Sequence, residues 1–182
     1  MKKNTSIYYV AELNLPRKSA YSIHVMKMCE AFSKLGFRIN LFVINSKNTS
    51  QIFKSYNLKD KFYINSIFSK FIELNFIYRA VFSIKILLKN FNQNSIFISR
   101  SIIFALIASV FNKKVILELH HEITGISKIF YNILNKLSLI DNLKYIFLNK
   151  KLNKIYKINP KKNIVLDDAV NINDFKFKKK IK

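Results

Sequence analysis

The sequence predicts an α/β domain with a Rossmann-like, mostly parallel sheet and helices on both of its faces. Short runs of apolar residues alternate with longer segments in which apolar residues recur at helical spacing. The short runs are apolar without interruption, which is typical of strands covered on both faces. The chain has 182 residues, 50% of them hydrophobic, which suffices for one domain with a substantial core and excludes a disordered chain.

The first elements predict a βαβ unit. Ile7–Ala11 is rich in Ile, Tyr and Val, as buried strands are. A polar loop at Glu12–Ser22 leads to Ile23–Leu35, whose apolar residues share one helical face, and Gly36 stands where helices often end in a left-handed residue. Ile39–Ile44 is the next predicted strand, and the connection between the two strands should be right-handed.

The same alternation continues along the rest of the chain, which favours a parallel sheet. Further helices are predicted at Gln51–Leu58, Phe71–Lys89, Ile102–Phe111, Thr124–Leu137 and Lys150–Tyr156. Further strands are predicted at Phe62–Ile67, Ser95–Ser99, Lys113–Leu119, Lys144–Leu148 and Asn163–Leu166. We therefore expect one domain over residues 1–170, followed by a basic tail at residues 171–182.

The net charge of +22 and the single cysteine, Cys29, bear on partners and compartment. One cysteine excludes an internal disulfide and favours a reducing compartment. A secretory signal and an apolar run of about 20 residues are both missing, so we expect a cytoplasmic protein. The lysines are spread among many Asn, Ile and Phe residues, all of which have A/T-rich codons. Base composition therefore accounts for the charge, with an anionic membrane surface or nucleic acid as alternative causes.

The loop Glu12–Ser22 is a candidate phosphate site because it opens a helix. Ser22 is the predicted N-cap of that helix. The loop contains no glycine and matches neither the dinucleotide-binding fingerprint nor the phosphate-binding loop of NTPases. Nucleotide binding by this loop alone is therefore not expected, and an ordinary capped helix start is the alternative.

Polar residues cluster where the strand Lys113–Leu119 ends, in the sequence Glu118-Leu119-His120-His121-Glu122. Glu118 and His120 should point to one face of the strand and Leu119 to the other. The spacing is not that of zinc proteases and no third ligand is evident, so no metal is predicted. We expect His120 to act as a general base or to bind a hydroxyl, the alternative being that it satisfies loop backbone groups.

Two more side chains are predicted at the same edge of the sheet, where ligands of open parallel sheets bind. His24 lies in the first turn of the first helix, and a partly exposed helix residue is the alternative. Arg100 follows the strand Ser95–Ser99 and either holds an anion or caps the next helix. Separately, Phe71–Lys89 mixes aromatic and basic residues, which is typical of a membrane-interfacial helix or of a core-covering helix with solvated lysines.

Four segments, in order along the chain, resemble family 4 glycosyltransferases, which have the GT-B fold. They are the first loop and helix from Asn14 to Gly36, Ile98-Ser99-Arg100-Ser101, the strand Val115–His120 ending in Glu-x-His, and the crossover-like segment Val165–Phe175. The chain departs from the family in having Ala20-Tyr21 near a common Gly-Gly pair, and Asp168-Ala169 where Asp-Gly is usual.

The resemblance implies the N-terminal, acceptor-side domain of a retaining, metal-independent enzyme. Such an enzyme transfers a hexose from a nucleotide sugar to a glycan or lipid-linked acceptor, usually in cell-surface polysaccharide assembly, without another cofactor. The resemblance also implies that His120 lies near the transferred sugar. The implied donor-phosphate loop is Ser19, Ala20, Tyr21 and Ser22, and we place His24, Arg100, Glu118, His121 and Glu122 in the acceptor cleft.

The donor-binding C-terminal domain of such enzymes has no counterpart in the 182 residues, so we expect this chain to be inactive alone. A separate C-terminal domain or subunit is the expected partner, which makes a split glycosyltransferase the first alternative. A basic, non-enzymatic α/β binding module is the second, although the chain carries no known nucleic-acid motif. Peripheral contact with an anionic membrane at its inner face is a further expectation.

Overall fold

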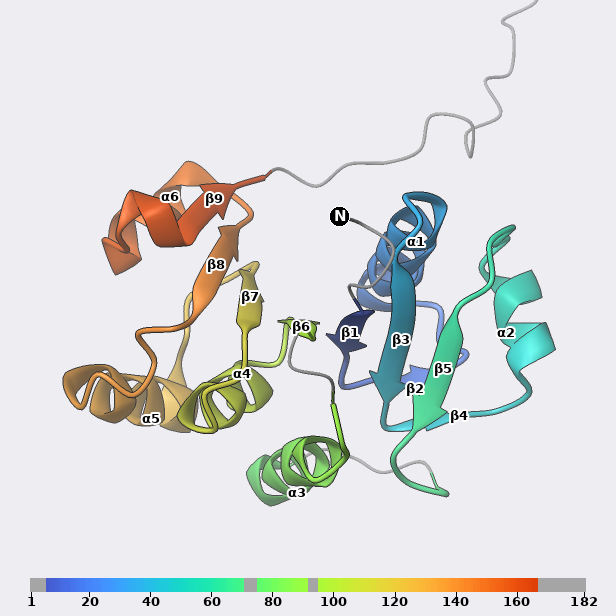
Figure 1. Ribbon diagram of the computed structural model, residues 1–182, viewed down its shortest axis with the longest axis horizontal. Helices are drawn as coiled ribbons and strands as arrows, with labels where there is room; N and C mark the ends of the chain where they lie inside the picture. The colour runs from blue at the N-terminus through green and yellow to red at the C-terminus, as the bar shows by residue number, and fades with distance from the viewer. Residues whose placement is uncertain (1–5, 71–74, 92–94, 167–182) are drawn as a thin grey trace, which may run out of the picture.

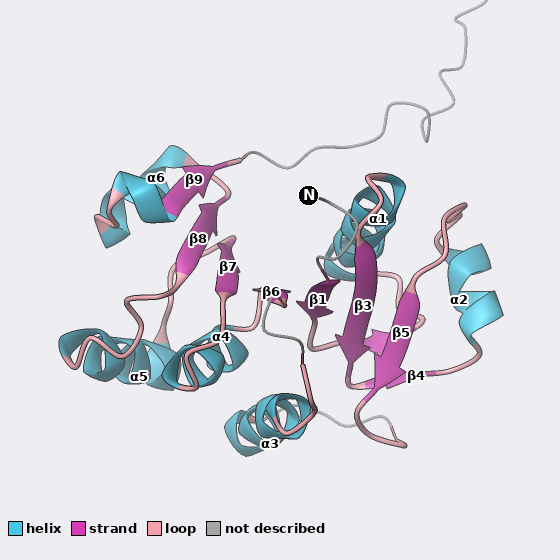
Figure 2. Ribbon diagram, viewed as in Figure 1, coloured by secondary structure: helices cyan, strands magenta, loops and turns pink. Residues whose placement is uncertain are grey.

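The computed structural model describes residues 6–70, 75–91 and 95–166, which form a Rossmann-like α/β fold. The strands are β1 (Ser6–Val10), β2 (Asn14–Leu15), β3 (Arg38–Val43), β4 (Asn45–Ser46), β5 (Tyr63–Ser66), β6 (Ile96–Ser99), β7 (Val115–Leu119), β8 (Lys144–Phe147) and β9 (Asn163–Val165). The helices are α1 (Ala20–Lys34), α2 (Thr49–Ser55), α3 (Phe76–Leu87), α4 (Ile102–Val110), α5 (Gly125–Lys136), α6 (Lys150–Tyr156) and the 3₁₀-helix η1 (Pro160–Lys162). Figures 1 and 2 show their arrangement.

Seven strands form the main sheet in the order β5-β3-β1-β6-β7-β8-β9, and every described strand pair in it is parallel. The chain first builds outward from β1 through β3 to β5, and then returns to add β6 to β9 on the other side of β1. The direction of winding therefore reverses between β1 and β6. In open parallel sheets, this switch point is where ligands bind, beyond the C-terminal ends of the strands.

The winding divides the helices between the two faces of the sheet, because parallel crossovers are right-handed. One core cluster packs α1 and α2 on the sheet, and the other packs α3, α4 and α5 on the opposite face. Along β1, Tyr9 belongs to the first cluster and Val10 to the second, as the twofold alternation of a strand requires. Figure 1 shows α3, α4 and α5 together on one side of the sheet.

The predicted fold class is confirmed, and each predicted helix and strand matches an element of the described chain within a few residues. The predicted start of the first helix is wrong. It begins at Ala20, and its N-cap is Ser19, not Ser22. The Ser19 side chain accepts a hydrogen bond from the Ser22 backbone N–H at 3.2 Å, while the Ser22 hydroxyl accepts one from the Ser19 N–H at 3.2 Å. This reciprocal capping box satisfies two N–H groups of the first turn.

Two other predictions concern the ends of helices. Gly36 follows α1 with a φ of 84°, so the predicted left-handed helix stop is confirmed. The helix predicted from Phe71 begins at Phe76, where Asn75 accepts a hydrogen bond from the Tyr78 N–H at 2.9 Å, and residues 71–74 lie outside the described residues. The predicted domain boundary at residue 170, the basic tail and most of the crossover-like segment also lie outside them.

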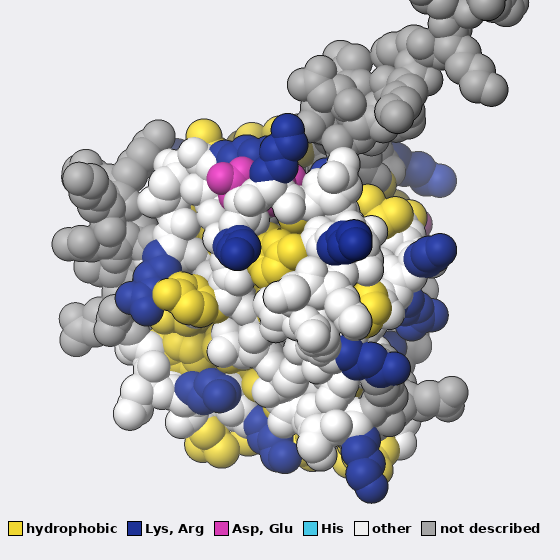
Figure 3. All heavy atoms as spheres, turned by 90° about the vertical axis from the view of Figure 1, so that its right-hand side faces the viewer, with side chains coloured by type: hydrophobic (Ala, Val, Ile, Leu, Met, Phe, Trp, Pro, Cys, Tyr) yellow, Lys and Arg dark blue, Asp and Glu magenta, His cyan; other side chains and the backbone are white. Residues whose placement is uncertain are grey.

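None of the described helices is long and apolar enough to cross a membrane. On the face shown in Figure 3, the Lys and Arg side chains stand apart from one another and do not merge into one basic patch. A continuous basic patch is the usual electrostatic footprint of a nucleic-acid-binding surface. This face therefore gives no support to a nucleic-acid partner.

Candidate functional site

The candidate site lies at the C-terminal edge of the sheet, beside the switch point between β1 and β6. Its side chains come from the end of β7, from the first turns of α1 and from the loops after β1 and β6. These segments are far apart in the sequence, and the strand order β1-β6-β7 brings them together.

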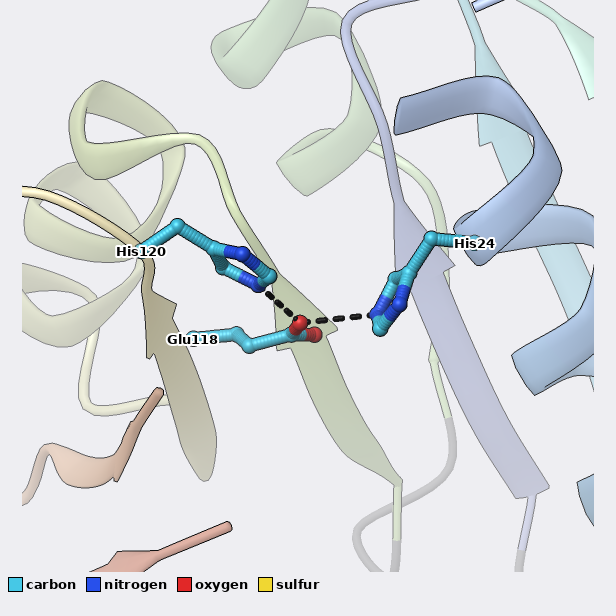
Figure 4. A group of neighbouring side chains, drawn as sticks. All are labelled: His24, Glu118 and His120. Carbon is cyan, nitrogen blue, oxygen red and sulfur yellow. Dashed lines mark hydrogen bonds and ion pairs between the residues drawn. The ribbon is translucent and has the colours of Figure 1, made fainter. Parts of the chain in front are cut away.

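The carboxylate of Glu118 is the centre of the site (Figure 4). Its Oε1 atom lies 2.5 Å from Nε2 of His120 and 2.8 Å from Nε2 of His24. Its Oε2 atom accepts a hydrogen bond from the hydroxyl of Tyr9 at 2.9 Å. One carboxylate thus holds two imidazole rings on one oxygen and a phenol on the other.

The local sequence explains how each of these groups reaches the site. Leu117 and Leu119 of β7 are buried on the α4–α5 side, so the alternation of the strand turns Glu118 toward the α1 side. Tyr9 of β1 points to the same side and is fully buried. Val25 is buried in the core cluster between α1 and the sheet. Its neighbour His24, in the second turn of α1, is therefore left at the edge of the sheet.

Burial and hydrogen bonding set the charges in this cluster. Burial alone would raise the pKa of Glu118, but the hydrogen bonds from His120, His24 and Tyr9 outweigh it and hold that pKa well below its usual range. Burial, reinforced by the negative charge of Glu118, raises the pKa of Tyr9. Glu118 is therefore ionised and Tyr9 protonated at neutral pH.

The geometry also indicates which ring nitrogen of each histidine carries a hydrogen. Because Nε2 of each ring faces the same carboxylate oxygen, the distances place a hydrogen on each Nε2 atom. In a neutral ring, Nδ1 is then the hydrogen-bond acceptor. The exposed fractions of the two side chains, 21% for His24 and 12% for His120, allow limited contact with solvent or a ligand. The arrangement can therefore bind a hydroxyl group or accept its proton.

The same three residues are the group in the described chain that could hold a metal ion. Their ligand atoms lie within 4.8 Å of one another, so the structure supplies, in His24, the third ligand that the sequence did not suggest. Around zinc, however, ligands at about 2.0–2.1 Å in tetrahedral geometry stand about 3.3 Å apart. The separations of 2.5 and 2.8 Å at Glu118 are those of direct hydrogen bonds, and a metal would have to break both.

A second polar cluster lies where β1 and β6 end. Glu12 accepts a hydrogen bond from the Ser101 hydroxyl at 2.5 Å and pairs with the guanidinium of Arg79 at 3.2 Å. Burial raises the pKa of Glu12, and the Ser101 hydrogen bond and the Arg79 charge partly oppose this rise. The guanidinium of Arg100 lies over the ring of Tyr21, 4.5 Å from its centroid, which ties the loop after β6 to the start of α1.

The structure brings some of the predicted site residues together and leaves others apart. It brings His24, Glu118 and His120 together, and it places Arg100 against Tyr21. Ser22 is fully buried, and its hydroxyl lies 2.5 Å from the carbonyl oxygen of Arg17 and 2.9 Å from that of Ser19. That buried hydroxyl therefore hydrogen-bonds to the backbone of the loop itself. Ala20 is exposed and Ser19 is half-buried in the first turn, and His121 and Glu122 are exposed beyond the end of β7.

Sequence reasoning missed Tyr9, Glu12 and Arg79 as members of the site. The twofold alternation of β1 puts Tyr9 on the α1 side, and Glu12 follows β1 directly, so both carried a usable signal. Arg79 could not be found in this way, because its contact with Glu12 depends on how α3 packs beneath the sheet edge.

The chain was compared with models of protein families and with curated proteins. Neither comparison finds a match to this sequence.

Proposed function

We propose that this chain is the acceptor-side half of a glycosyltransferase similar to those of family 4. The complete enzyme would transfer a hexose from a nucleotide sugar to a glycan or lipid-linked acceptor. The donor-binding half would come from further sequence or from a separate polypeptide. This division follows from the resemblance of the four segments, and the fold of the described residues is compatible with it.

The observation that carries the proposal is the meeting of three of the resembling segments at one place. The start of α1 contributes His24, the end of β7 contributes Glu118 and His120, and the loop after β6 contributes Arg100, whose guanidinium lies over Tyr21 of α1. This place is the switch point of the sheet, where a ligand is expected on physical grounds that do not depend on the resemblance.

In the proposed function, His120 contacts a hydroxyl of the sugar through Nδ1, the ring nitrogen that does not face Glu118. Glu118 is a positioning residue, because it orients both imidazole rings and is itself oriented by Tyr9. The first turn of α1 offers backbone N–H groups and the positive end of the helix dipole to a donor phosphate. Ala20 stands exposed in that turn, which leaves room for a phosphate to approach.

The proposal predicts that the chain alone binds acceptor sugars weakly. Saturation-transfer NMR on the full 182-residue chain with a panel of neutral hexose oligosaccharides should detect binding of at least one member. His120→Ala should abolish this signal. Tyr63→Ala is the control, since it removes an exposed aromatic ring from the edge strand β5, outside the site, and it should leave binding intact.

Two results would overturn the proposal. One is the failure of every panel member to bind. The other is binding that His120→Ala and Tyr63→Ala affect equally. Tight binding to DNA or RNA that weakens steeply with added salt would instead favour the basic binding module. A purified chain that transfers sugar from a nucleotide sugar by itself would contradict the expectation that the chain is inactive alone.

A further inference from the structure

The surface formed by α3 and α5 carries an unusual number of exposed apolar side chains. On α3 and the residue after it, Ile77, Val81, Ile84 and Leu88 are exposed. They follow one another at intervals of four, three and four residues, so they form one stripe along the helix. The opposite side of α3 is buried through Phe82 and Ile86. The helix is therefore apolar on both sides, whereas a surface helix is normally polar on its outer side.

A matching stripe runs along α5, which flanks α4 on its other side. Ile126, Ile129, Ile133 and Leu137 are 52–62% exposed and recur at intervals of three, four and four residues. Tyr131 and Leu134 bury the inner side of the same helix. Both helices pack with α4 into the same core cluster, and the lower part of Figure 1 shows the three helices together on one face of the sheet. The two exposed stripes therefore belong to the same helical layer. We call these eight residues the apolar face.

The charges around the apolar face are mostly positive. None of α3, α4 and α5 contains an aspartate or glutamate, and the sequence from residue 74 to residue 117 contains none either. Cationic residues lie on the helices or directly after them. They are Lys85, Lys89, Lys113, Lys114, Lys128 and Lys136, whereas Arg79 of α3 is paired with Glu12. Glu122 and Asp141, exposed on either side of α5, are acidic, but the cations outnumber them. An outward apolar stripe with an excess of cations around it is complementary to anionic headgroups lying over acyl chains.

We propose that the apolar face docks on the surface of an anionic lipid bilayer, with the eight apolar side chains in the interfacial layer and the lysines against the headgroups. A second copy of the chain is the alternative occupant. It suits the face less well, because facing two such surfaces would bring cations toward cations. The proposal is independent of the sugar-binding site, which is built on the C-terminal edge of the sheet and the α1 side.

The test is co-sedimentation of the full chain with vesicles at low salt. Vesicles of phosphatidylcholine with phosphatidylglycerol should bind the chain, and vesicles of phosphatidylcholine alone should bind it much less. Binding should weaken at high salt, because the screening length shortens. Ile77→Glu and Ile129→Glu should each reduce binding. Leu35→Glu changes an exposed residue outside the apolar face and should not.

Charge variants separate the electrostatic contribution. Lys128→Gln with Lys136→Gln should weaken binding about fivefold for each lysine removed. The matched control, Lys54→Gln with Lys61→Gln, removes two exposed lysines near α2 and β5 and should have little effect, because α2 packs on the opposite face of the sheet. All of these positions are exposed, so thermal melting by circular dichroism should confirm that the variants fold.

Three outcomes would overturn the proposal. They are no binding to anionic vesicles, equal binding to both kinds of vesicle, and equal loss of binding in the two pairs of lysine variants. A dimer in light scattering that Ile129→Glu dissociates, together with the absence of vesicle binding, would assign the face to self-association.

Discussion

Replacing Glu118 with glutamine tests the carboxylate at the centre of the site. The substitution keeps the size of the side chain and removes its negative charge. In the native protein this carboxylate accepts hydrogen bonds from His120 and Tyr9 at 2.5 and 2.9 Å and pairs with Nε2 of His24 at 2.8 Å. An amide has only one acceptor oxygen, so its NH₂ group must face either the two imidazole rings or the phenol.

The expected loss of stability follows from these three bonds. A hydrogen bond to a charged group contributes about 1.5–3 kcal/mol and a neutral one about 0.5–1.5 kcal/mol, so three weakened contacts lose about 3–4.5 kcal/mol. The amide also avoids the cost of burying a charge, which offsets part of that loss. We expect Glu118→Gln to lower the free energy of unfolding by about 1–2 kcal/mol at pH 7.

The pH dependence is the sharper part of this prediction. Because the pKa of Glu118 is depressed in the folded protein, its contribution is complete above the ordinary Glu pKa of about 4.3 and is lost as the pH falls below it. The loss is about 1.4 kcal/mol per pH unit, or about 2 kcal/mol between pH 4.3 and pH 3. The difference between the native protein and Glu118→Gln should therefore approach zero near pH 3.

Urea unfolding followed by circular dichroism at pH 7, 5 and 3 measures this difference. Using the difference removes effects shared by both proteins, such as the raised pKa of Glu12 and the repulsion within a chain of net charge +22. Glu122→Gln is the matched control, since it makes the same charge change at an exposed position two residues past His120. A difference that stays constant from pH 7 to pH 3, or that Glu122→Gln reproduces, would refute the ionised, hydrogen-bonded carboxylate.

Two further predictions concern the core. Phe82→Ala should lower the free energy of unfolding by about 3–5 kcal/mol because Phe82 is fully buried, whereas Leu88→Ala, at a residue 78% exposed just after the same helix, should change it by less than about 0.5 kcal/mol in the same urea assay. Equal effects would mean that the buried side of α3 is misassigned. Cys29 is fully buried, and burial raises the pKa of its thiol, so Ellman's reagent should react with it slowly in native buffer and quickly in denaturing urea. Rapid reaction in native buffer would contradict this packing.

The order of helices and strands could be predicted because the pattern of apolar residues within each element indicates which of its sides is buried. A strand covered on both faces, such as β7, is a short apolar run, and the apolar residues of α1 repeat at helical spacing. The start of α1 was predicted wrongly, with Ser22 as the N-cap, because serine is a good capping residue at either position. The structure uses both in one capping box, with Ser19 as the N-cap.

The contact between His24 and Glu118 could not be predicted from local patterns. The two residues are 94 positions apart, and they meet only because β7 lies two strands from β1 while α1 crosses on the same face as the Glu118 side chain. Strand order depends on the whole chain, and no short sequence pattern indicates it. The alternation of β7 still predicted that Glu118 and Leu119 face opposite ways, and this part of the site is confirmed.

The helix predicted at Phe71–Lys89 shows that apolar periodicity does not always predict which side of a helix is buried. Its sequence is compatible with a membrane-interfacial helix and with a core-covering helix. In the described part, α3 covers the core with Phe82 and Ile86, and on its outer side it exposes Ile77 and Ile84. A helix that is apolar on two opposite sides has no single apolar stripe, so its sequence cannot say which side is buried. Only the packing against α4 decides this, and it leaves the Ile77 and Ile84 side exposed.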